Sequence, residues 1–198
     1  AIGSVMNYFL NLILFSFSKL AVAVFGAYFK VQSMAFMPVF GLNNGMIPII
    51  SYNYGAQRPD RMKRTMKLGV MVGCSIMLFC LVIMQILKIF DATDDMLSMG
   101  IPAVRIMSIA FIFAGFSVTC SGMFQAVGKG VYSMIVSMAR QLFVILPVAY
   151  FLSKAMNSVN GVWTAFPIAE IFSVIISTFL LLRVYKKIVK PLERGQIE

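Results

Sequence analysis

The sequence has no histidine, few acidic residues and few charges of either sign. Asp and Glu together number 7, and charged residues make up 12% of the 198 positions, about half the share that is usual in soluble domains. Without histidine, a zinc centre and a Ser-His-Asp triad both lack a residue they commonly use. The three cysteines, Cys74, Cys80 and Cys120, lie inside apolar runs, as small buried side chains do. We expect no enzyme, no metal site and no cofactor.

Apolar residues are abundant instead, at 60% of the chain, with a mean hydropathy of +0.89. Six apolar segments stand at 1–18, 20–52, 66–89, 100–124, 131–152 and 161–184. A helix needs about 20 residues to cross the hydrocarbon core, and all segments except the first clearly reach that length. The sequence predicts an all-α integral membrane protein, with a six-helix transmembrane bundle over 1–187. A short basic tail follows at 188–198. Since the chain begins with Ala inside an apolar run, we also expect it to be a piece of a longer protein.

The net charge of +10 is concentrated on alternate connections between these segments. Eleven basic residues lie around the loop 53–65, the linker 125–130 and the tail, against three around the other connections. The eleven are Arg58, Arg61, Lys63, Arg64, Lys67, Lys129, Arg183, Lys186, Lys187, Lys190 and Arg194. Cytoplasmic loops of membrane proteins carry this excess. We therefore expect a multi-pass protein of the plasma (cytoplasmic) membrane with loop 53–65 and the C-terminus in the cytoplasm. This topology explains the charge without a nucleic-acid partner.

The second apolar segment contains Pro38 and Pro48, with glycines between them. Proline removes a backbone donor and crowds the preceding turn, so a kink or a break in the helix is expected here. Asn43 and Asn44 would lie in that break. They either line a cavity or belong to a bent helix that packs closely on its neighbours.

Three ionisable side chains, Lys30, Arg140 and Glu170, lie about ten residues into their segments, which is near the middle of the membrane. Glu170 is the only acidic residue inside any segment, so we expect it to be neutral or paired with Arg140 or Lys30. Such a group is either part of a proton or cation relay at a substrate cavity, or one half of a buried ion pair that fixes helix register. The candidate substrate- and ion-binding residues are Asn7, Asn11, Lys30, Gln32, Asn43, Asn44, Arg140 and Glu170.

Three stretches resemble a known family of transporters. "MPVFGLNNGMIPIISYNYGAQRPDRMKRTMKLG" (37–69) is similar to the helix–loop–helix signature of the multidrug and toxic-compound extrusion (MATE) family. "GMFQAVGKG" (122–130) resembles its turn between the fourth and fifth helices of a lobe, and "ARQLFVILP" (139–147) the helix that follows. The resemblance implies one six-helix lobe, expected to be the C-terminal one, of a twelve-helix transporter. Its partner would be the missing N-terminal lobe of the same chain.

The resemblance also implies secondary active efflux. Members of the family export cationic or amphipathic organic compounds against protons or sodium, through a cavity that opens alternately to each side. In the sodium-coupled branch, acidic residues in the first and fourth helices of the second lobe bind the cation. Here the first helix offers Asn7 and Asn11, and the fourth segment has no acidic residue. That cation site does not carry over, and coupling would rest on Glu170 or on the other lobe.

Two alternatives remain open on the sequence. A flippase for lipid-linked glycans would need cationic groups in its cavity, and Lys30, Arg105 and Arg140 are available. A non-transporting scaffold or an inert fragment is the second alternative. It would be favoured if Lys30, Arg140 and Glu170 closed into one network of ion pairs and the asparagines bonded only to neighbouring backbone.

Overall fold

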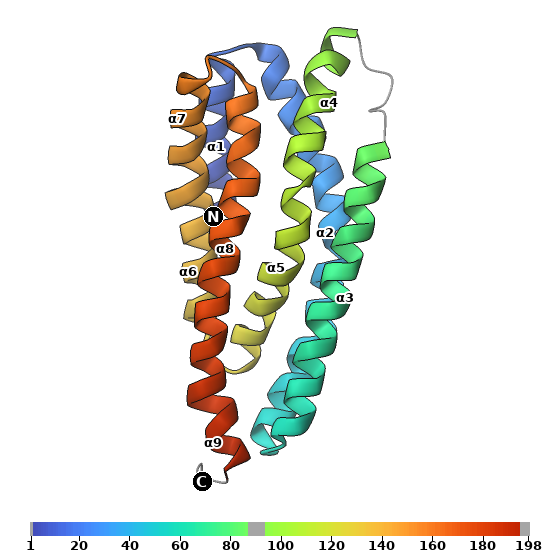
Figure 1. Ribbon diagram of the computed structural model, residues 1–198, viewed down its shortest axis with the longest axis vertical. Helices are drawn as coiled ribbons and strands as arrows, with labels where there is room; N and C mark the ends of the chain where they lie inside the picture. The colour runs from blue at the N-terminus through green and yellow to red at the C-terminus, as the bar shows by residue number, and fades with distance from the viewer. Residues whose placement is uncertain (1, 87–93, 195–198) are drawn as a thin grey trace.

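The protein is a bundle of helices, seen in a computed structural model that describes residues 2–86 and 94–194 (Figure 1). All of its regular elements in those ranges are helical, so the predicted all-α class is confirmed. In chain order they are α1 (Ile2–Phe15), α2 (Lys19–Gly55), α3 (Pro59–Ile86), α4 (Asp94–Ser108), α5 (Ala110–Ala126), α6 (Gly130–Met138), the π-helix η1 (Ala139–Ile145), α7 (Leu146–Ala155), α8 (Asn160–Val184), the π-helix η2 (Tyr185–Val189) and α9 (Lys190–Glu193).

Four helical stretches in the described ranges are long and apolar enough to cross a membrane: Lys19–Gly55, Pro59–Gln85, Gly130–Ala155 and Asn160–Glu193. The pair α4 and α5 makes a fifth span if it is counted as one helix bent by 44°. The first predicted segment is a shorter apolar helix, α1, of 14 residues. The last span runs on through η2 and α9, so the first residues of the predicted tail are helical and Leu192 is buried. Residues 195–198 of that tail lie outside the described residues.

Of the kink or break that we expected in the second segment, the break does not occur, because α2 continues as one helix of 37 residues past Pro38 and Pro48. Both prolines are exposed, and the backbone bonds that they remove do not end the helix. A bend of 44° lies between α4 and α5, next to Ile109. Pro102 lies inside α4.

Three connecting turns close their helices in the same way. A residue with positive φ follows the helix: Gln57 (52°), Gly128 (73°) and Asn157 (45°). The next backbone N–H then donates to the carbonyl five residues earlier, from Arg58 to Asn53, from Lys129 to Phe124 and from Ser158 to Ser153. This is the Schellman arrangement, which satisfies carbonyls at a helix C-terminus.

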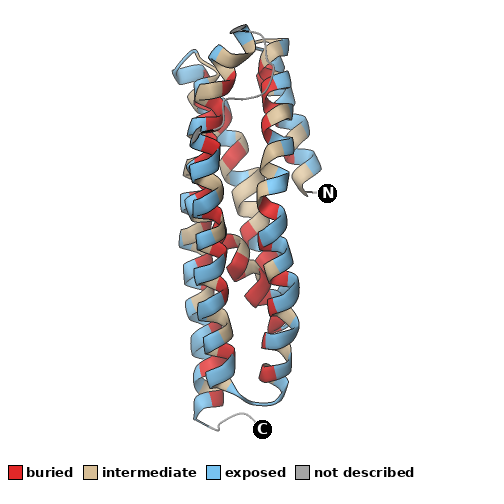
Figure 2. Cartoon of the chain, turned by 90° about the vertical axis from the view of Figure 1, so that its right-hand side faces the viewer, coloured by how far each residue is buried: buried red, intermediate tan, exposed pale blue. Residues whose placement is uncertain are grey.

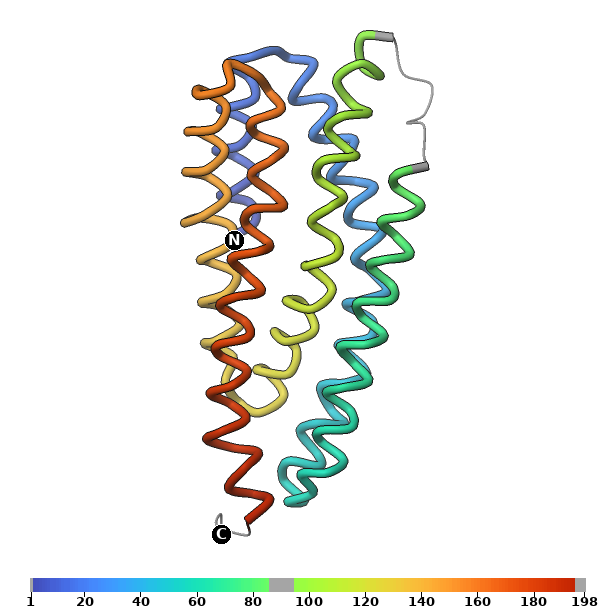
Figure 3. Tube along the Cα trace, in the orientation of Figure 1, coloured from blue at the N-terminus to red at the C-terminus, as the bar shows by residue number. Residues whose placement is uncertain are grey.

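The turns alternate between the two ends of the bundle (Figure 3). The α2–α3 and α5–α6 turns lie toward one end together with the C-terminal α9, and the α1–α2 and α7–α8 turns lie at the other. The basic residues of the loop 53–65 and of the C-terminal helix therefore share one end. A salt bridge joins these two regions there, with Nζ of Lys63 at 2.5 Å from Oε1 of Glu193.

Helix α5 is the central helix, packed against α2, α3, α6 and α8. Buried residues follow the inner faces of the helices, and exposed residues cover the outside (Figure 2). Close approach of α3 and α5 depends on glycine, since a Cβ at Gly115 would lie 2.9 Å from the carbonyl oxygen of Gly73. Small residues of this kind let membrane helices pack backbone to backbone.

Candidate functional site

A layer of buried polar residues divides the core into two apolar clusters. The larger cluster contains Phe111 and Trp163, and the smaller one contains Met62 and Phe124. Helices α2, α5 and α8 contribute to both clusters and carry buried polar side chains between them. These are Asn43 on α2, Ser117 and Thr119 on α5, and Glu170, Ser173 and Ser177 on α8, and the half-buried Arg140 of η1 joins them. Polar groups at this depth are costly in a membrane, and those that occur there commonly serve function.

An ion pair lies in the middle of this layer. Nη1 of Arg140 donates a hydrogen bond of 2.7 Å to Oε1 of Glu170, and only 19% and 10% of the two side chains are exposed. The predicted pairing of Glu170 with Arg140 is therefore confirmed. Arg140 lies in the first turn of the π-helix η1. A π-helix shifts the side chains that follow it relative to an α-helix, and such segments are frequent at functional sites.

Several buried polar atoms around the pair have no hydrogen-bond partner among the described residues. They include Oε2 of Glu170, Oη of Tyr28, Oε1 of Gln32 and Oγ of Ser173. Buried polar atoms in proteins are almost always hydrogen-bonded, to protein or to water. A group of unpartnered polar atoms around one carboxylate is therefore typical of a site that binds a ligand or water.

The first pocket at this layer, which we call the carboxylate pocket, has a volume of about 360 Å³. Four phenylalanines and two methionines form much of its wall: Phe29, Phe36, Phe40, Phe166, Met6 and Met37. Glu170, Arg140, Gln32 and Gln141 supply its polar groups. An apolar, aromatic wall with one carboxylate suits an organic compound that carries a positive charge, because aromatic faces and carboxylates both attract cations.

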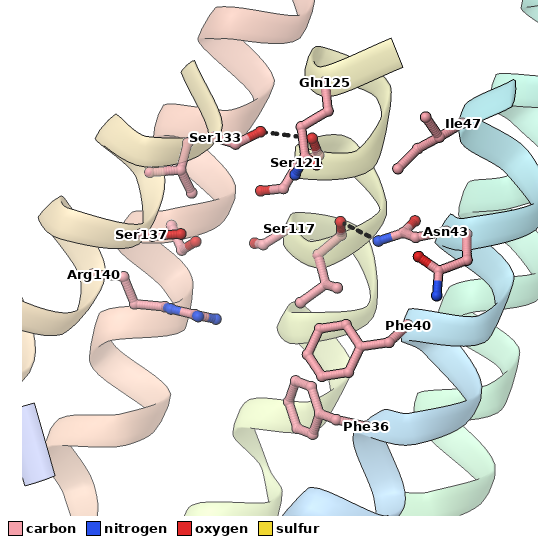
Figure 4. Close-up of a pocket in the computed structure, with 14 residues that line it drawn as sticks. Phe36, Phe40, Asn43, Ile47, Ser117, Ser121, Gln125, Ser133, Ser137 and Arg140 are labelled. Carbon is pink, nitrogen blue, oxygen red and sulfur yellow. Dashed lines mark hydrogen bonds between the residues drawn. The ribbon is translucent and has the colours of Figure 1, made fainter. Parts of the chain in front are cut away.

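The second pocket, which we call the serine pocket, has a volume of about 290 Å³ and a different chemistry. Five serines line it, Ser117, Ser121, Ser133, Ser137 and Ser173, together with Asn43, Asn44, Gln125 and Arg140. Figure 4 shows these side chains converging from α2, α5, α6 and η1. No carboxylate lines it, and eight of its fourteen lining residues carry a hydroxyl or an amide group.

The two pockets share three lining residues, Phe36, Phe40 and Arg140. Arg140 thus lies where the pockets adjoin, while Glu170 lines only the carboxylate pocket. Ser173, one turn along α8 from Glu170, lines only the serine pocket. The ion pair is consequently bordered by an aromatic compartment and by a hydroxyl-rich one.

The candidate residues read from the sequence are distributed unevenly over this site. Gln32, Arg140 and Glu170 line the carboxylate pocket, and Asn43, Asn44 and Arg140 line the serine pocket. The remaining three line neither: Asn7 has a buried, unpartnered Oδ1, whereas Asn11 and Lys30 are exposed. Lys30 and Arg140, equally deep by residue count, therefore occupy different surroundings.

The serines of the second pocket are absent from the sequence-based candidates, as is Tyr28. The spacing of these serines along the sequence could have identified them. Ser117, Ser121 and Gln125 recur every fourth residue, and Ser133 and Ser137 are four apart, which places each set on one helix face. Four-residue spacing of polar side chains within an apolar segment thus marks the wall of this pocket.

Helices long enough to cross a membrane surround a buried ion pair and two pockets, which defines a multi-pass membrane protein with a polar interior. Residues 1–151 match the family model described as MatE. The chain belongs to the MatE family. The resemblance noted from the three sequence stretches is therefore confirmed, and with it the expectation that the chain is not an enzyme.

The similar curated proteins are multidrug export proteins named MepA. The one from Staphylococcus haemolyticus is 24% identical over 176 residues, which cover 86% of this chain and 38% of that protein. The one from Staphylococcus saprophyticus is 26% identical over 160 residues, covering 78% and 35%. The chain thus spans little more than a third of the length of these relatives.

Several solved transporter structures share the fold of this chain. An outward-facing multidrug resistance MATE family transporter aligns with a TM-score of 0.85 at 20% identity, over 96% of this chain and 44% of that one. An inward-facing one aligns with a TM-score of 0.86 at 19% identity, over 98% and 46%. The fold of this chain is accordingly that of slightly less than half of such a transporter.

Proposed function

We propose that this chain forms one six-helix lobe of a secondary transporter that exports cationic or amphipathic organic compounds. The observation that carries the proposal is the carboxylate pocket, where four phenylalanines surround a buried glutamate in the middle of the bundle. The second lobe, which contributes the rest of the central cavity, is the partner that this arrangement requires. Alternating access then follows from rocking of the two lobes about their shared midplane site.

Glu170 is the group through which we propose that export is coupled to an ion gradient. When ionised, it offers a cationic compound in the carboxylate pocket one oxygen, Oε2, that Arg140 does not bind. When protonated, it loses its attraction for the compound, and the compound is released. Protons and organic cations then compete for one site, which is the simplest chemistry of antiport. A single carboxylate that also holds Arg140 offers few oxygens to a sodium ion, so we favour the proton as the coupling ion.

The distribution of charge supports a cytoplasmic location for the α2–α3 turn and the C-terminal helix. Both lie at the end of the bundle that is rich in arginine and lysine, and short cytoplasmic connections are the ones enriched in these residues. In this orientation the protein is a multi-pass protein of the plasma membrane, with α7 and α8 joined on the outer side.

A glycan flippase is less well supported. Its pyrophosphate cargo would call for a cavity of net positive charge, but Arg140 is neutralised by Glu170. Lys30 and Arg105 line neither of the two pockets. An inert scaffold also fits less well, since Lys30 is not part of the ion pair. Moreover, Asn43 donates to the carbonyl of Val118 on another helix and leaves its own Oδ1 unpartnered.

The test is the Glu170→Gln substitution in the complete transporter. We expect it to abolish export of an organic cation such as ethidium from cells when export is normalised to the amount of transporter that reaches the membrane. Glu193→Gln is the matched control, because it makes the same chemical change at the end of the bundle, where Glu193 pairs with Lys63. Unchanged export by the Glu170→Gln protein would remove this residue from the coupling mechanism.

A further inference from the structure

The serine pocket is more polar than the carboxylate pocket. Eight of its fourteen lining residues carry a hydroxyl or an amide, and two of these, Asn43 and Ser173, are more than nine-tenths buried with an unpartnered oxygen each. A water molecule is stable inside a protein where it finds two to four polar partners and enough room. A volume of about 290 Å³ is enough for several water molecules.

The pocket also leads to the ion pair. Arg140 belongs to its wall, and Ser173 lies one turn along α8 from Glu170. The unpartnered Oγ of Ser173 can both donate and accept a hydrogen bond, so it is able to continue a chain of water molecules to Oε2 of Glu170, which is also unpartnered. The carboxylate pocket has the same glutamate in its own wall, together with Arg140.

We propose that the serine pocket is a water-filled passage by which protons reach and leave Glu170, separately from the organic compound, which uses the carboxylate pocket. This inference rests on the proposed role of Glu170 in coupling and adds the route of the proton to it. The substrate of the passage is water and the hydrated proton. Its wall consists of the five serines with Asn43, Asn44 and Gln125.

The transfer itself needs no further reactant. A hydronium ion in the passage gives its proton to Oε2 of Glu170, so that one O–H bond of hydronium breaks, one O–H bond of the carboxylic acid forms and water remains. Arg140 then donates to a neutral carboxylic acid in place of a carboxylate, so its hydrogen bond to Oε1 becomes weaker. The reverse step returns the proton to water in the passage.

The titratable groups presented to Glu170 are few. Arg140 faces it from η1, and the buried phenol of Tyr28 comes from α2, where its ring contacts Phe166 of α8. Among the side chains that the structure describes, the other elements packed on α8 keep their charges exposed, with Asp95 and Arg105 on α4, Lys154 on α7, and Lys186 and Lys187 on η2. Helix α5 adds only the thiol of Cys120, and α6 adds only Tyr132, which packs on Phe124. The loss of negative charge when Glu170 is protonated therefore acts most strongly on Arg140.

The experiment uses the complete transporter in a cysteine-free background that still exports. Ser137 lines the passage, is half-buried and makes no hydrogen bond within the described residues that would be lost on replacement. We expect Ser137→Cys to react with a small, charged methanethiosulfonate reagent supplied on both faces of membrane vesicles. The control is Phe79→Cys, which replaces an exposed side chain on the apolar outer face of α3. It should not react, because the charged reagent does not enter lipid.

Function is measured on the same samples. Modification of the thiol introduced by Ser137→Cys fills the passage, so proton-coupled export should slow at least about tenfold, the change that about 1.4 kcal/mol of added barrier produces. Equilibrium binding of the organic cation in the carboxylate pocket should stay within about twofold, well below that change. As a second variant, Ser137→Leu should reproduce this split without a reagent, whereas Ser75→Leu, at an exposed serine on α3, should leave both readouts unchanged.

The outcomes separate the two proposals. If Glu170→Gln abolishes coupled export but the Ser137→Cys protein does not react, the pocket is dry, and the passage is refuted while the coupling role stands. Reaction of the Ser137→Cys protein without any loss of export also refutes the passage. Coupled export that survives Glu170→Gln refutes the coupling role itself, whatever the labelling result.

Discussion

The buried ion pair gives the sharpest test of the energetics of this lobe. Arg140 and Glu170 are 2.7 Å apart and largely shielded from solvent, with 19% and 10% of their side chains exposed. Removing one partner of such a pair leaves a charge without compensation and costs about 3–5 kcal/mol, whereas replacing both with apolar groups of similar size is often neutral or stabilising. We therefore expect Arg140→Met to lower the free energy of unfolding by about 3–5 kcal/mol, and most of the loss to be recovered in the Arg140→Met, Glu170→Met double variant.

The measurement is a double-mutant cycle on the purified transporter, unfolded by denaturant in detergent micelles. Four proteins are compared: the parent, Arg140→Met, Glu170→Met and the double variant. The free-energy changes of residues that do not interact add to within about 0.3–0.5 kcal/mol. If the two single substitutions add within that margin, neither partner contributes to the stability of the other, and our account of the polar layer is incorrect.

Two further predictions concern packing and orientation. Gly161→Ala places a Cβ about 2.5 Å from backbone atoms of Leu152, and since backbone cannot rotate away, thermal unfolding should show a loss of about 1–3 kcal/mol. Gly26→Ala, with nothing within 4 Å of the added Cβ, should show no loss, and equal effects would contradict the close contact between α7 and α8. In intact cells, an impermeant thiol reagent should label Met156→Cys, in the α7–α8 turn, and not Arg61→Cys near the α2–α3 turn; the reverse pattern would overturn the orientation.

The sequence was sufficient for the fold because membrane helices are recognisable by their length and hydropathy. It also placed Arg140 and Glu170 at a common depth, since each residue of a helix adds about 1.5 Å along the axis. Residue count gave Lys30 and Arg140 the same depth, so it could not predict that Arg140 lines the pockets whereas Lys30 is exposed. Whether a side chain points into the bundle depends on how its helix is rotated against its neighbours, and a highly apolar helix carries little pattern to fix that rotation.

The sequence also did not predict where the helix backbone is irregular. The prolines of α2 predicted an interruption that does not occur, whereas the bend next to Ile109 lies at a site without proline. The π-helix that begins at Ala139 also has no residue signature of its own. Both irregularities arise from packing between helices, so they become visible only once the bundle is assembled. The serine pocket follows from the same assembly, although the four-residue spacing of its serines was present in the sequence.

Three side chains from neighbouring helices donate hydrogen bonds to backbone carbonyls of α5 between Val118 and Ala126. Asn43 bonds the carbonyl of Val118 (3.0 Å), Ser133 that of Ser121 (2.6 Å) and Ser51 that of Ala126 (2.8 Å). Sliding this half of α5 along its axis would break all three bonds at once, inside a medium that offers no replacements. The C-terminal half of α5 is thereby held in register with α2 and α6, and the bend next to Ile109 lies outside the stretch that these bonds hold.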